Sequence, residues 1–426
     1  MKKEKRLMFR KTLPNGLRVV GERMKEYRSV SMGVWINAGS VYELGSESGA
    51  AHFIEHMLFK GTANRSASDI AEEMDAVGGN LNAFTSKECT CFYGRVLGKD
   101  LGTLASVLAD ILENSLLDPK DIELEKGVVC EEILMNEDSP EDLVTDAAIS
   151  EYYKGDPLER PILGTQESVR GFTREGLVGY MNRLYRPDNM VLAAAGDLDP
   201  DKLMETVSNC FSSAGNASGS DTEFGLHTPG KRLKFISKDI EQTHISICLP
   251  GFKKDTAESY AMLLFSNAFG GSMSSRLFQK IREENGLAYS VYSYPTAYKN
   301  SGFLTLYAGT GAENAAKVAE MMLDEVRRAR REGITREELA RARDQLISSF
   351  LMAQESTSAR SSAIGRAELL RGRHYTEDEV IAKINAVRME DVEAILDRAL
   401  SLEDISASVV GRIGRSENEL RKILLG

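Results

Sequence analysis

The sequence lacks the long apolar stretches that mark membrane proteins. Its 426 residues contain no uninterrupted run of eighteen apolar residues, so no transmembrane helix is expected. The basic N-terminus, residues 1–6, is not followed by the apolar core of a secretory signal. We therefore predict a cytoplasmic protein that does not insert into a membrane.

Cysteine is scarce as well. Five cysteines, an odd number without regular spacing, do not suggest a disulfide framework and are typical of reduced thiols in a cytoplasm. Cys89 and Cys91 would share one face of a strand, but no second cysteine pair completes a zinc site, so we interpret this pair as packing. The full set is Cys89, Cys91, Cys130, Cys210 and Cys248.

Basic residues are too few and too dispersed for a nucleic-acid-binding protein. The chain has 53 Lys and Arg against 64 Asp and Glu, which gives a net charge of −11. Binding to phosphates depends on clustered Lys and Arg, and no such cluster follows the first six residues, so nucleic acid is disfavoured as a partner.

The chain is long enough for two domains of about 200 residues each. An apolar segment that ends in Gly196 has a counterpart that ends in Gly411, about half the chain later. Residues 213–228 have the Ser-, Gly- and Asn-rich composition of a linker. We predict a metal-binding domain at 1–212 and a second homologous domain without a metal site at 229–426.

Each half mixes helical and strand periodicity. Alternating apolar residues favour strands at 17–22 and 29–38, followed by a strand pair at 80–86 and 90–96. Helical patterns fill most of 101–184. The predicted fold class is α+β, with two similar domains related by internal duplication, each a mostly antiparallel sheet covered by a helical layer.

Histidine is rare, yet two of the five histidines, His52 and His56, lie four positions apart. On a helix they share one face, so both imidazoles can reach a single ion. Two imidazoles and an oxygen ligand usually bind zinc and leave a position for water, whose proton a nearby carboxylate such as Glu55 can accept. The order His-x-x-Glu-His is the inverted zinc-protease pattern. A buried helix could also carry this pattern by chance.

Two histidines leave such a site one ligand short. Glu125 and Glu132 are seven residues apart in a predicted helix at 121–135, so they share a face, which borders the apolar Val128 and Ile133. Two carboxylates that face a core need a cation. The alternative is a surface helix with ordinary charges.

The segment 52–62, His-Phe-Ile-Glu-His-Met-Leu-Phe-Lys-Gly-Thr, resembles the pitrilysin/insulinase family of zinc peptidases. Within that family it is most similar to the β subunit of mitochondrial processing peptidase and to half-length bacterial processing proteases. The resemblance implies one zinc ion per chain, held by His52, His56 and Glu132, with Glu55 as general base and Glu125 supporting the site.

Two further segments extend the resemblance. Residues 78–85 resemble the family's edge strand, to which an extended peptide adds, and this implies substrate contacts at Asn82, Ala83 and Phe84. On its residues alone this segment is an ordinary hairpin strand. In the second half, Arg282 and Tyr289 match a family pair that contacts the substrate and stabilises the tetrahedral intermediate.

Together these features predict a zinc-dependent endopeptidase that hydrolyses peptides or unfolded segments, with Glu55 acting on a zinc-bound water. Family members of double length enclose a chamber between two fused chains, so a homodimer is expected here. The Arg282–Tyr289 pair could then act within its own chain or on the other copy. The alternatives are a non-catalytic structural or assembly subunit of the same fold, and a maturation peptidase dedicated to one peptide.

Overall fold

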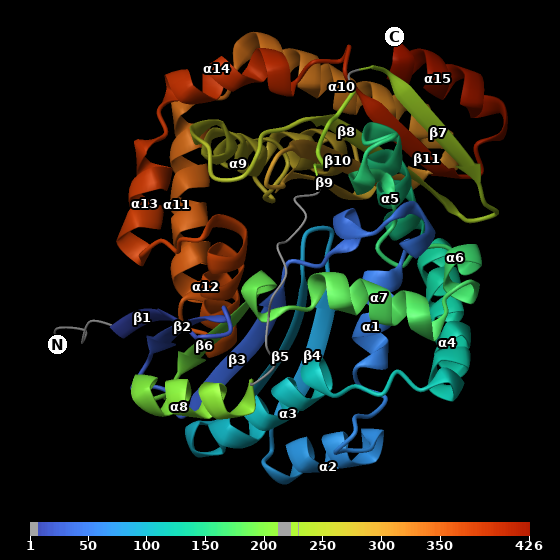
Figure 1. Cartoon of the computed structure of the whole chain (residues 1–426). Coiled ribbons are helices and arrows are strands. Elements are labelled where there is room, and N and C mark those ends of the chain that lie inside the picture. Colours follow the sequence, from blue (N-terminus) through green and yellow to red (C-terminus); the bar gives the residue numbers. More distant parts are fainter. Residues whose placement is uncertain (1–6, 212–222, 229) are drawn as a thin grey trace. The chain divides into compact units, whose positions relative to one another are not determined.

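The computed structural model describes residues 7–211, 223–228 and 230–426, which form two compact units (Figure 1). The first unit combines Met1–Ile133, Arg160–Thr222 and Leu351–Thr376, and the second takes the rest of the chain. Each unit thus contains helices from the other half of the sequence. Helix α5 (Pro140–Tyr152) packs on the sheet of the second unit, and α12 (Thr357–Arg371) packs on the sheet of the first.

The first unit is built on a six-stranded sheet in the order β1-β2-β6-β3-β5-β4. All neighbouring strands are antiparallel except β2 and β6. The strands predicted from the sequence in this unit are present, and the structure adds β1, which was not predicted. Their bounds are β1 Leu7–Thr12, β2 Arg18–Arg23, β3 Ser29–Ile36, β4 Asn80–Thr85, β5 Thr90–Leu97 and β6 Met190–Gly196.

Helices cover this sheet: α12 packs on β2, β3 and β6, whereas α1 and α3 pack on β5. The helix α1 carries the two neighbouring histidines, and α4 carries Glu125 and Glu132. The helices of this unit are α1 Ala50–Met57, α2 Ala67–Ala76, α3 Leu101–Glu113, α4 Pro119–Asp138, α6 Gln166–Arg170, α7 Arg174–Leu184, α8 Pro200–Cys210 and α12.

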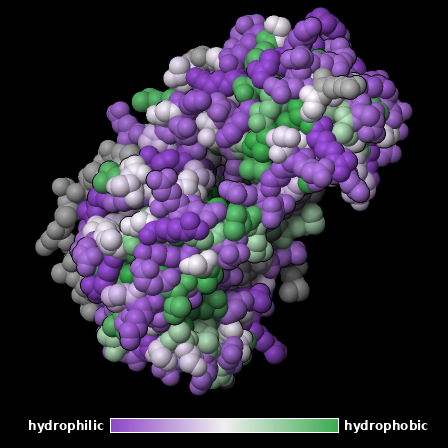
Figure 2. All heavy atoms as spheres, turned by 90° about the vertical axis from the view of Figure 1, so that its right-hand side faces the viewer, coloured by the Kyte–Doolittle hydropathy of each residue, from purple (hydrophilic) through white to green (hydrophobic). Residues whose placement is uncertain are grey.

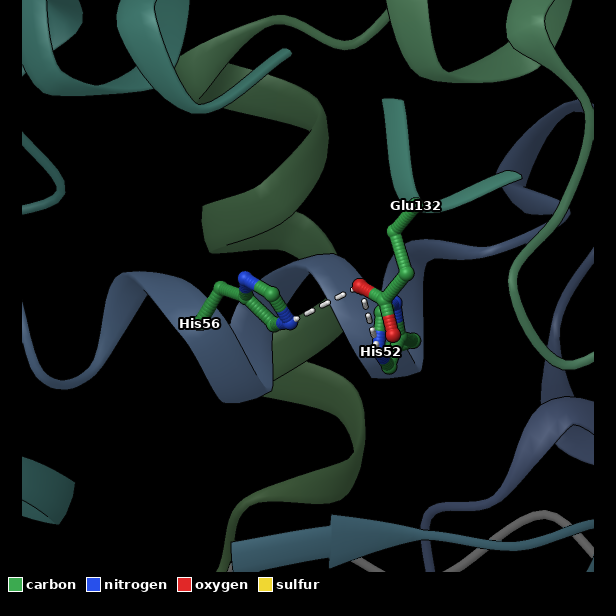
Figure 3. Close-up of side chains that lie close together, drawn as sticks. All are labelled: His52, His56 and Glu132. Atoms are coloured by element: carbon green, nitrogen blue, oxygen red, sulfur yellow. Dashed lines mark ion pairs between the residues drawn. The ribbon is translucent and has the colours of Figure 1, made fainter. Parts of the chain in front are cut away.

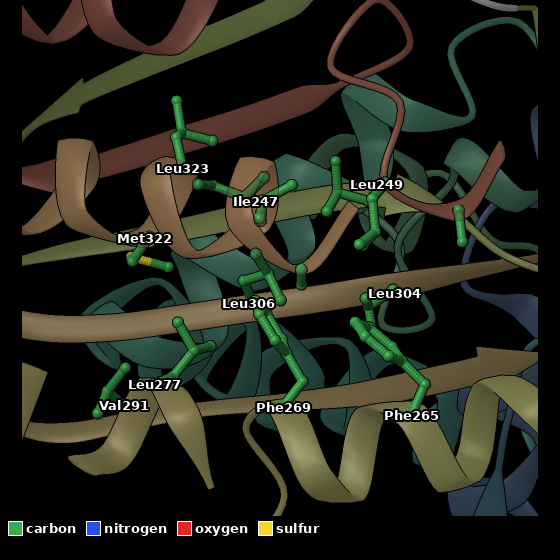
Figure 4. Packing of buried hydrophobic residues seen from close by; sticks show 14 of the residues in the cluster. Ile247, Leu249, Phe265, Phe269, Leu277, Val291, Leu304, Leu306, Met322 and Leu323 are labelled. Atoms are coloured by element: carbon green, nitrogen blue, oxygen red, sulfur yellow. The ribbon is translucent and has the colours of Figure 1, made fainter. Parts of the chain in front are cut away.

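The second unit has a five-stranded sheet in the order β7-β11-β8-β10-β9, in which only β7 and β11 are parallel. Its core joins apolar side chains of β8 and β10 to those of α9 and α10 (Figure 4). The strands are β7 Arg232–Ser237, β8 Gln242–Pro250, β9 Ala288–Ala297, β10 Gly302–Gly311 and β11 Ser406–Gly411. The helices are α5, α9 Ala257–Phe269, α10 Ala315–Glu332, α11 Arg336–Ala353, α13 Glu377–Ala386, α14 Met389–Ala399 and α15 Glu417–Leu425.

The two sheets share one topology, since β2-β6-β3-β5-β4 is repeated as β7-β11-β8-β10-β9 with the parallel pair in the same place. Gly196 and Gly411 end equivalent strands with φ of 135° and 149°. A Cβ at Gly196 would lie 2.2 Å from the carbonyl oxygen of Ser29, so a larger residue would clash there. The predicted α+β fold with internal duplication is confirmed.

The predicted linker at 213–228 lies partly outside the described residues, which begin again at 223. Residues 223–228 have no regular secondary structure. The boundaries at 212 and 229 stay a prediction. The crossing of α5 and α12 into the opposite unit was not anticipated from the sequence.

Hydrophilic residues dominate the face shown in Figure 2, with hydrophobic residues in small patches among them. Among the residues with described structure, no helix has both the length and the apolar character that spanning a membrane requires. All five cysteines are free thiols.

The helix α12 approaches its sheet most closely at Gly365. A Cβ there would lie 2.3 Å from Trp35 Nε1 and 2.8 Å from Ala193 Cβ. Gly365→Ala should therefore lower the free energy of unfolding by about 1–3 kcal/mol through overpacking, although alanine is the better helix former. Urea unfolding followed by the fluorescence of Trp35, the only tryptophan, measures the effect.

The matched control is Gly179→Ala within α7, where no atom lies within 4 Å of the added Cβ. This variant should be neutral or stabilised by up to about 1 kcal/mol, because it gains helix propensity without a clash. Equal stability of the two variants would contradict the close approach of α12.

Candidate metal centre

The short helix α1 is held at its N-terminus by a buried carboxylate. Glu43, which is 3% exposed, accepts hydrogen bonds from the backbone N–H groups of Gly49 and Ala51, at 3.0 Å each. Burial raises the pKa of Glu43 to about 8, against the opposing effect of these two bonds. Glu43 thus fixes the start of the helix that carries the inverted motif. No local sequence pattern revealed this role.

Close packing also restricts the residue at the N-cap of α1. Gly49 has φ of 89°, and a Cβ there would lie 2.7 Å from the carbonyl oxygen of Leu163. The helix is buried along most of its length, and Phe53 packs edge-on against Phe172 with ring centroids 5.2 Å apart. The two histidines are therefore held on a rigid support.

The structure brings the three predicted ligands together (Figure 3). His52 and His56 lie side by side on α1, with ring centroids 4.6 Å apart. Glu132 reaches them from α4, and its Oε2 lies 3.7 Å from His52 Nε2 and 3.5 Å from His56 Nε2. One ligand atom from each residue lies within 4.8 Å of the other two.

This donor set fits zinc. Two imidazoles and one carboxylate are a common set in catalytic zinc sites, and tetrahedral ligands at about 2.0–2.1 Å from the ion are about 3.3–3.4 Å apart. The Nε2–Oε2 separations of 3.5 and 3.7 Å are close to that value. Burial, and secondarily the charge on His56, lowers the pKa of His52 to about 4, so its imidazole is neutral at pH 7 and can ligate a metal.

The carboxylate of Glu125 contacts the Nδ1 side of the His56 ring, away from the Nε2 atom that faces Glu132. His56 Nδ1 lies 2.8 Å from Glu125 Oε1, and the Nζ of Lys60 lies 2.5 Å from Oε2 of the same carboxylate. Burial opposes ionisation of Glu125, but the hydrogen bonds from His56 and Lys60 outweigh it and lower the pKa of Glu125. The ionised Glu125 favours the tautomer with the proton on Nδ1, which leaves Nε2 free to ligate.

Lys60 was not anticipated as part of the site, although it lies four residues after His56 in the same segment. One detail of the sequence-based prediction was wrong. Val128 was expected beside the core, but its side chain is 51% exposed. The reason is that the buried face of α4 is centred on Glu125, Val129 and Ile133, and Leu124, at 71% exposure, lies outside it as well.

Glu55 lies on α1 outside the three-residue cluster. Its Oε2 accepts a hydrogen bond of 2.5 Å from the Thr85 hydroxyl. Burial raises the pKa of Glu55, and the bond from Thr85 partly offsets this effect. Thr85, at the end of β4, was not singled out in the sequence.

The predicted substrate residues Asn82, Ala83 and Phe84 lie on β4, which forms one edge of its sheet. Within the described ranges β4 pairs with β5 on one side only, so its outer edge is open to an added strand. Asn82 is exposed and Ala83 is buried. Phe84 packs edge-on against Trp35, with ring centroids 5.4 Å apart.

In the second unit the structure brings Arg282 and Tyr289 into contact. Arg282 Nη1 donates to the backbone carbonyl of Tyr289 at 2.8 Å, and its guanidinium lies 4.8 Å from the Tyr289 ring centroid. The same guanidinium carbon lies 4.7 Å from the ring centroid of Phe278. Tyr289 is 75% exposed, so the pair presents two polar donors at the surface.

Comparison with known families finds two matches that follow one another along the chain. Residues 18–166 match the family described as insulinase (peptidase family M16). Residues 171–346 match the family described as the peptidase M16 inactive domain. The candidate ligands all fall within the first match.

Similar proteins extend along nearly the whole chain. The uncharacterized zinc protease YmxG of Bacillus subtilis is 41% identical over 96% of this chain and 99% of its own length. The uncharacterized zinc protease Rv2782c of Mycobacterium tuberculosis is 40% identical over 95% of this chain and 93% of its own. Among solved structures, a protease from Helicobacter pylori superimposes with a TM-score of 0.88 at 19% identity, covering 95% of this chain and 99% of that chain.

Proposed function

This chain belongs to peptidase family M16, the insulinase family, and on that premise we propose that it is a zinc-dependent endopeptidase of peptides or unfolded protein segments. The observation that supports this most is the convergence of His52, His56 and Glu132. Relatives that share about two fifths of the sequence are named zinc proteases.

In this proposal His52, His56 and Glu132 hold one zinc ion per chain, which when bound would polarise the attacking water and the scissile carbonyl. Glu55 accepts the proton of the water and returns it to the leaving amine. Burial, which raises the pKa of Glu55, suits a carboxylate that must both take up and release a proton. Glu125 keeps His56 oriented throughout.

The substrate adds to the open edge of β4, where main-chain hydrogen bonds accept many sequences. Strand addition needs an extended backbone, and this favours peptides and unfolded segments over folded proteins.

We propose further that the protein works as a homodimer. The zinc ligands lie in the first unit, whereas Arg282 and Tyr289 lie in the second. A guanidinium and a phenol are suitable donors to the oxyanion that develops in peptide hydrolysis. In the dimer each copy would supply this pair to the site of the other copy.

The proposal is tested first on the wild-type protein. It should contain about one zinc per chain and cleave an unstructured fluorogenic peptide. A chelator should abolish cleavage and added zinc should restore it, while circular dichroism shows that the fold persists. Zinc binding without cleavage of any member of a peptide library would support the non-catalytic subunit instead. Cleavage confined to one peptide would support a dedicated maturation peptidase.

A further inference from the structure

Thr85 connects the strand β4 to the carboxylate of Glu55. It is the last residue of β4, and its hydroxyl lies 2.5 Å from Glu55 Oε2. Such a short O–H···O contact is typical of a hydroxyl that donates to an ionised carboxylate. Within the described residues no hydrogen bond reaches the other carboxylate oxygen, Oε1. One oxygen of Glu55 is thus held, and the other is available for proton transfer.

Thr85 has two possible hydrogen-bond acceptors, Glu55 and the neighbouring hydroxyl of Thr90. Thr90 lies opposite Thr85 in the hairpin, and the Oγ1 atoms of the two residues are 3.3 Å apart. The Thr90 hydroxyl donates its own proton to the carbonyl oxygen of Ala38 at 2.8 Å. Thr90 is fully buried, so this arrangement is rigid. With its own proton on Ala38, Thr90 can only accept from Thr85. The single proton of Thr85 points to Glu55 instead, because the carboxylate oxygen is closer, at 2.5 Å against 3.3 Å, and is the stronger acceptor.

The end of β4 is itself tightly fixed. The turn that follows is closed by a bond from the N–H of Ser86 to the carbonyl of Cys89 at 2.8 Å, and Ser86 Oγ accepts from Cys89 N at 3.1 Å. On the other side of Thr85, Phe84 packs on Trp35. The Thr85 hydroxyl is therefore presented to Glu55 by a rigid hairpin rather than by a mobile loop.

From this geometry we infer that Thr85 is a positioning residue, which holds the carboxylate of Glu55 in the orientation needed for proton transfer and ties it to the strand that receives the peptide. The inference rests on the proposed peptidase function. Because Thr85 touches the base and not the ligand cluster, it should influence turnover without influencing zinc binding.

Three substitutions separate this role from a purely structural one. Thr85→Val keeps the shape and the β-branched preference for a strand but removes the donor, whereas Thr85→Ser keeps the donor. Thr12→Val is the matched control, because Thr12 ends β1 at the opposite edge of the same sheet. All three proteins are compared with wild type for zinc content, thermal unfolding and cleavage of an unstructured fluorogenic peptide.

We expect Thr85→Val to lower kcat about 10–100-fold, the range typical of residues that orient a catalytic group, with zinc content unchanged and KM within about twofold. Thr85→Ser should stay within about threefold of wild type, and Thr12→Val should match wild type. Adding Thr85→Val to Glu55→Gln should leave the Kd for a fluorescein-labelled peptide unchanged. Crystal structures should show the Glu55 side chain rotated in Thr85→Val and unmoved in Thr85→Ser.

Wild-type kinetics in Thr85→Val would overturn the inference, as would a rise in KM alone, which would make Thr85 a peptide contact. A wild-type protein that cleaves no peptide would refute the proposed function separately. The crystallographic comparison would still decide the positioning role in that case, because an unmoved Glu55 in Thr85→Val contradicts it.

Discussion

Glu55→Gln should leave the zinc content at about one ion per chain and reduce peptide cleavage by about 10²–10⁴-fold, the usual contribution of a general base. Glutamine has the shape of glutamate but cannot accept the proton of the attacking water. Glu55 lies outside the cluster of His52, His56 and Glu132, so the substitution removes no ligand. Metal analysis of the purified protein and cleavage of a fluorogenic peptide measure both quantities.

The contrasting variant is Glu132→Gln, which should lose most of the zinc together with activity, because Glu132 supplies the third ligand atom. Its neighbour on α4 provides the matched control: Glu131 is exposed and should tolerate Glu131→Gln without loss of zinc. Wild-type zinc affinity in Glu132→Gln would show that the third ligand is wrong. Full activity in Glu55→Gln would remove Glu55 from the mechanism.

Mixing two inactive proteins, Glu55→Gln and Tyr289→Phe, should restore activity if the pair Arg282–Tyr289 acts on the other copy of a homodimer. A mixed dimer then has one site with both defects and one site with neither. Each mixed dimer should therefore show roughly half the wild-type activity if the two sites work independently. Activity is measured after subunit exchange, which fluorescence energy transfer between labelled copies can demonstrate.

Each variant incubated alone under the same exchange conditions is the control, and neither should recover activity. No recovery in the mixture, despite demonstrated exchange, would mean that Tyr289 acts within its own chain. Substantial activity in Tyr289→Phe alone would instead show that the phenol is not needed. A protein that stays monomeric at all concentrations would contradict the homodimer itself.

The ligand set could be predicted because its geometry is local. Residues four or seven apart on a helix share a face in any protein, so His52 with His56, and Glu125 with Glu132, could be grouped from spacing alone. That these two pairs meet across α1 and α4 was implied by the family resemblance. Thr85 is separated from Glu55 by 30 positions, and Glu43 precedes the helix whose first N–H groups it binds, so no helical or strand periodicity marks either supporting residue.

The sequence by itself determined the main strands and helices of the first half, where the duplication lies, and which residues could bind a metal. These properties follow from short-range periodicity and from the chemistry of individual side chains. Only the tertiary structure decided that α12 covers the sheet of the first unit and α5 that of the second. This assignment depends on close packing between distant residues, such as Gly365 against Trp35. Only the tertiary structure also brought the Thr85 hydroxyl to the carboxylate of Glu55. Contacts of this kind are set by complementary shapes and by hydrogen-bond partners that come together only when the chain has folded.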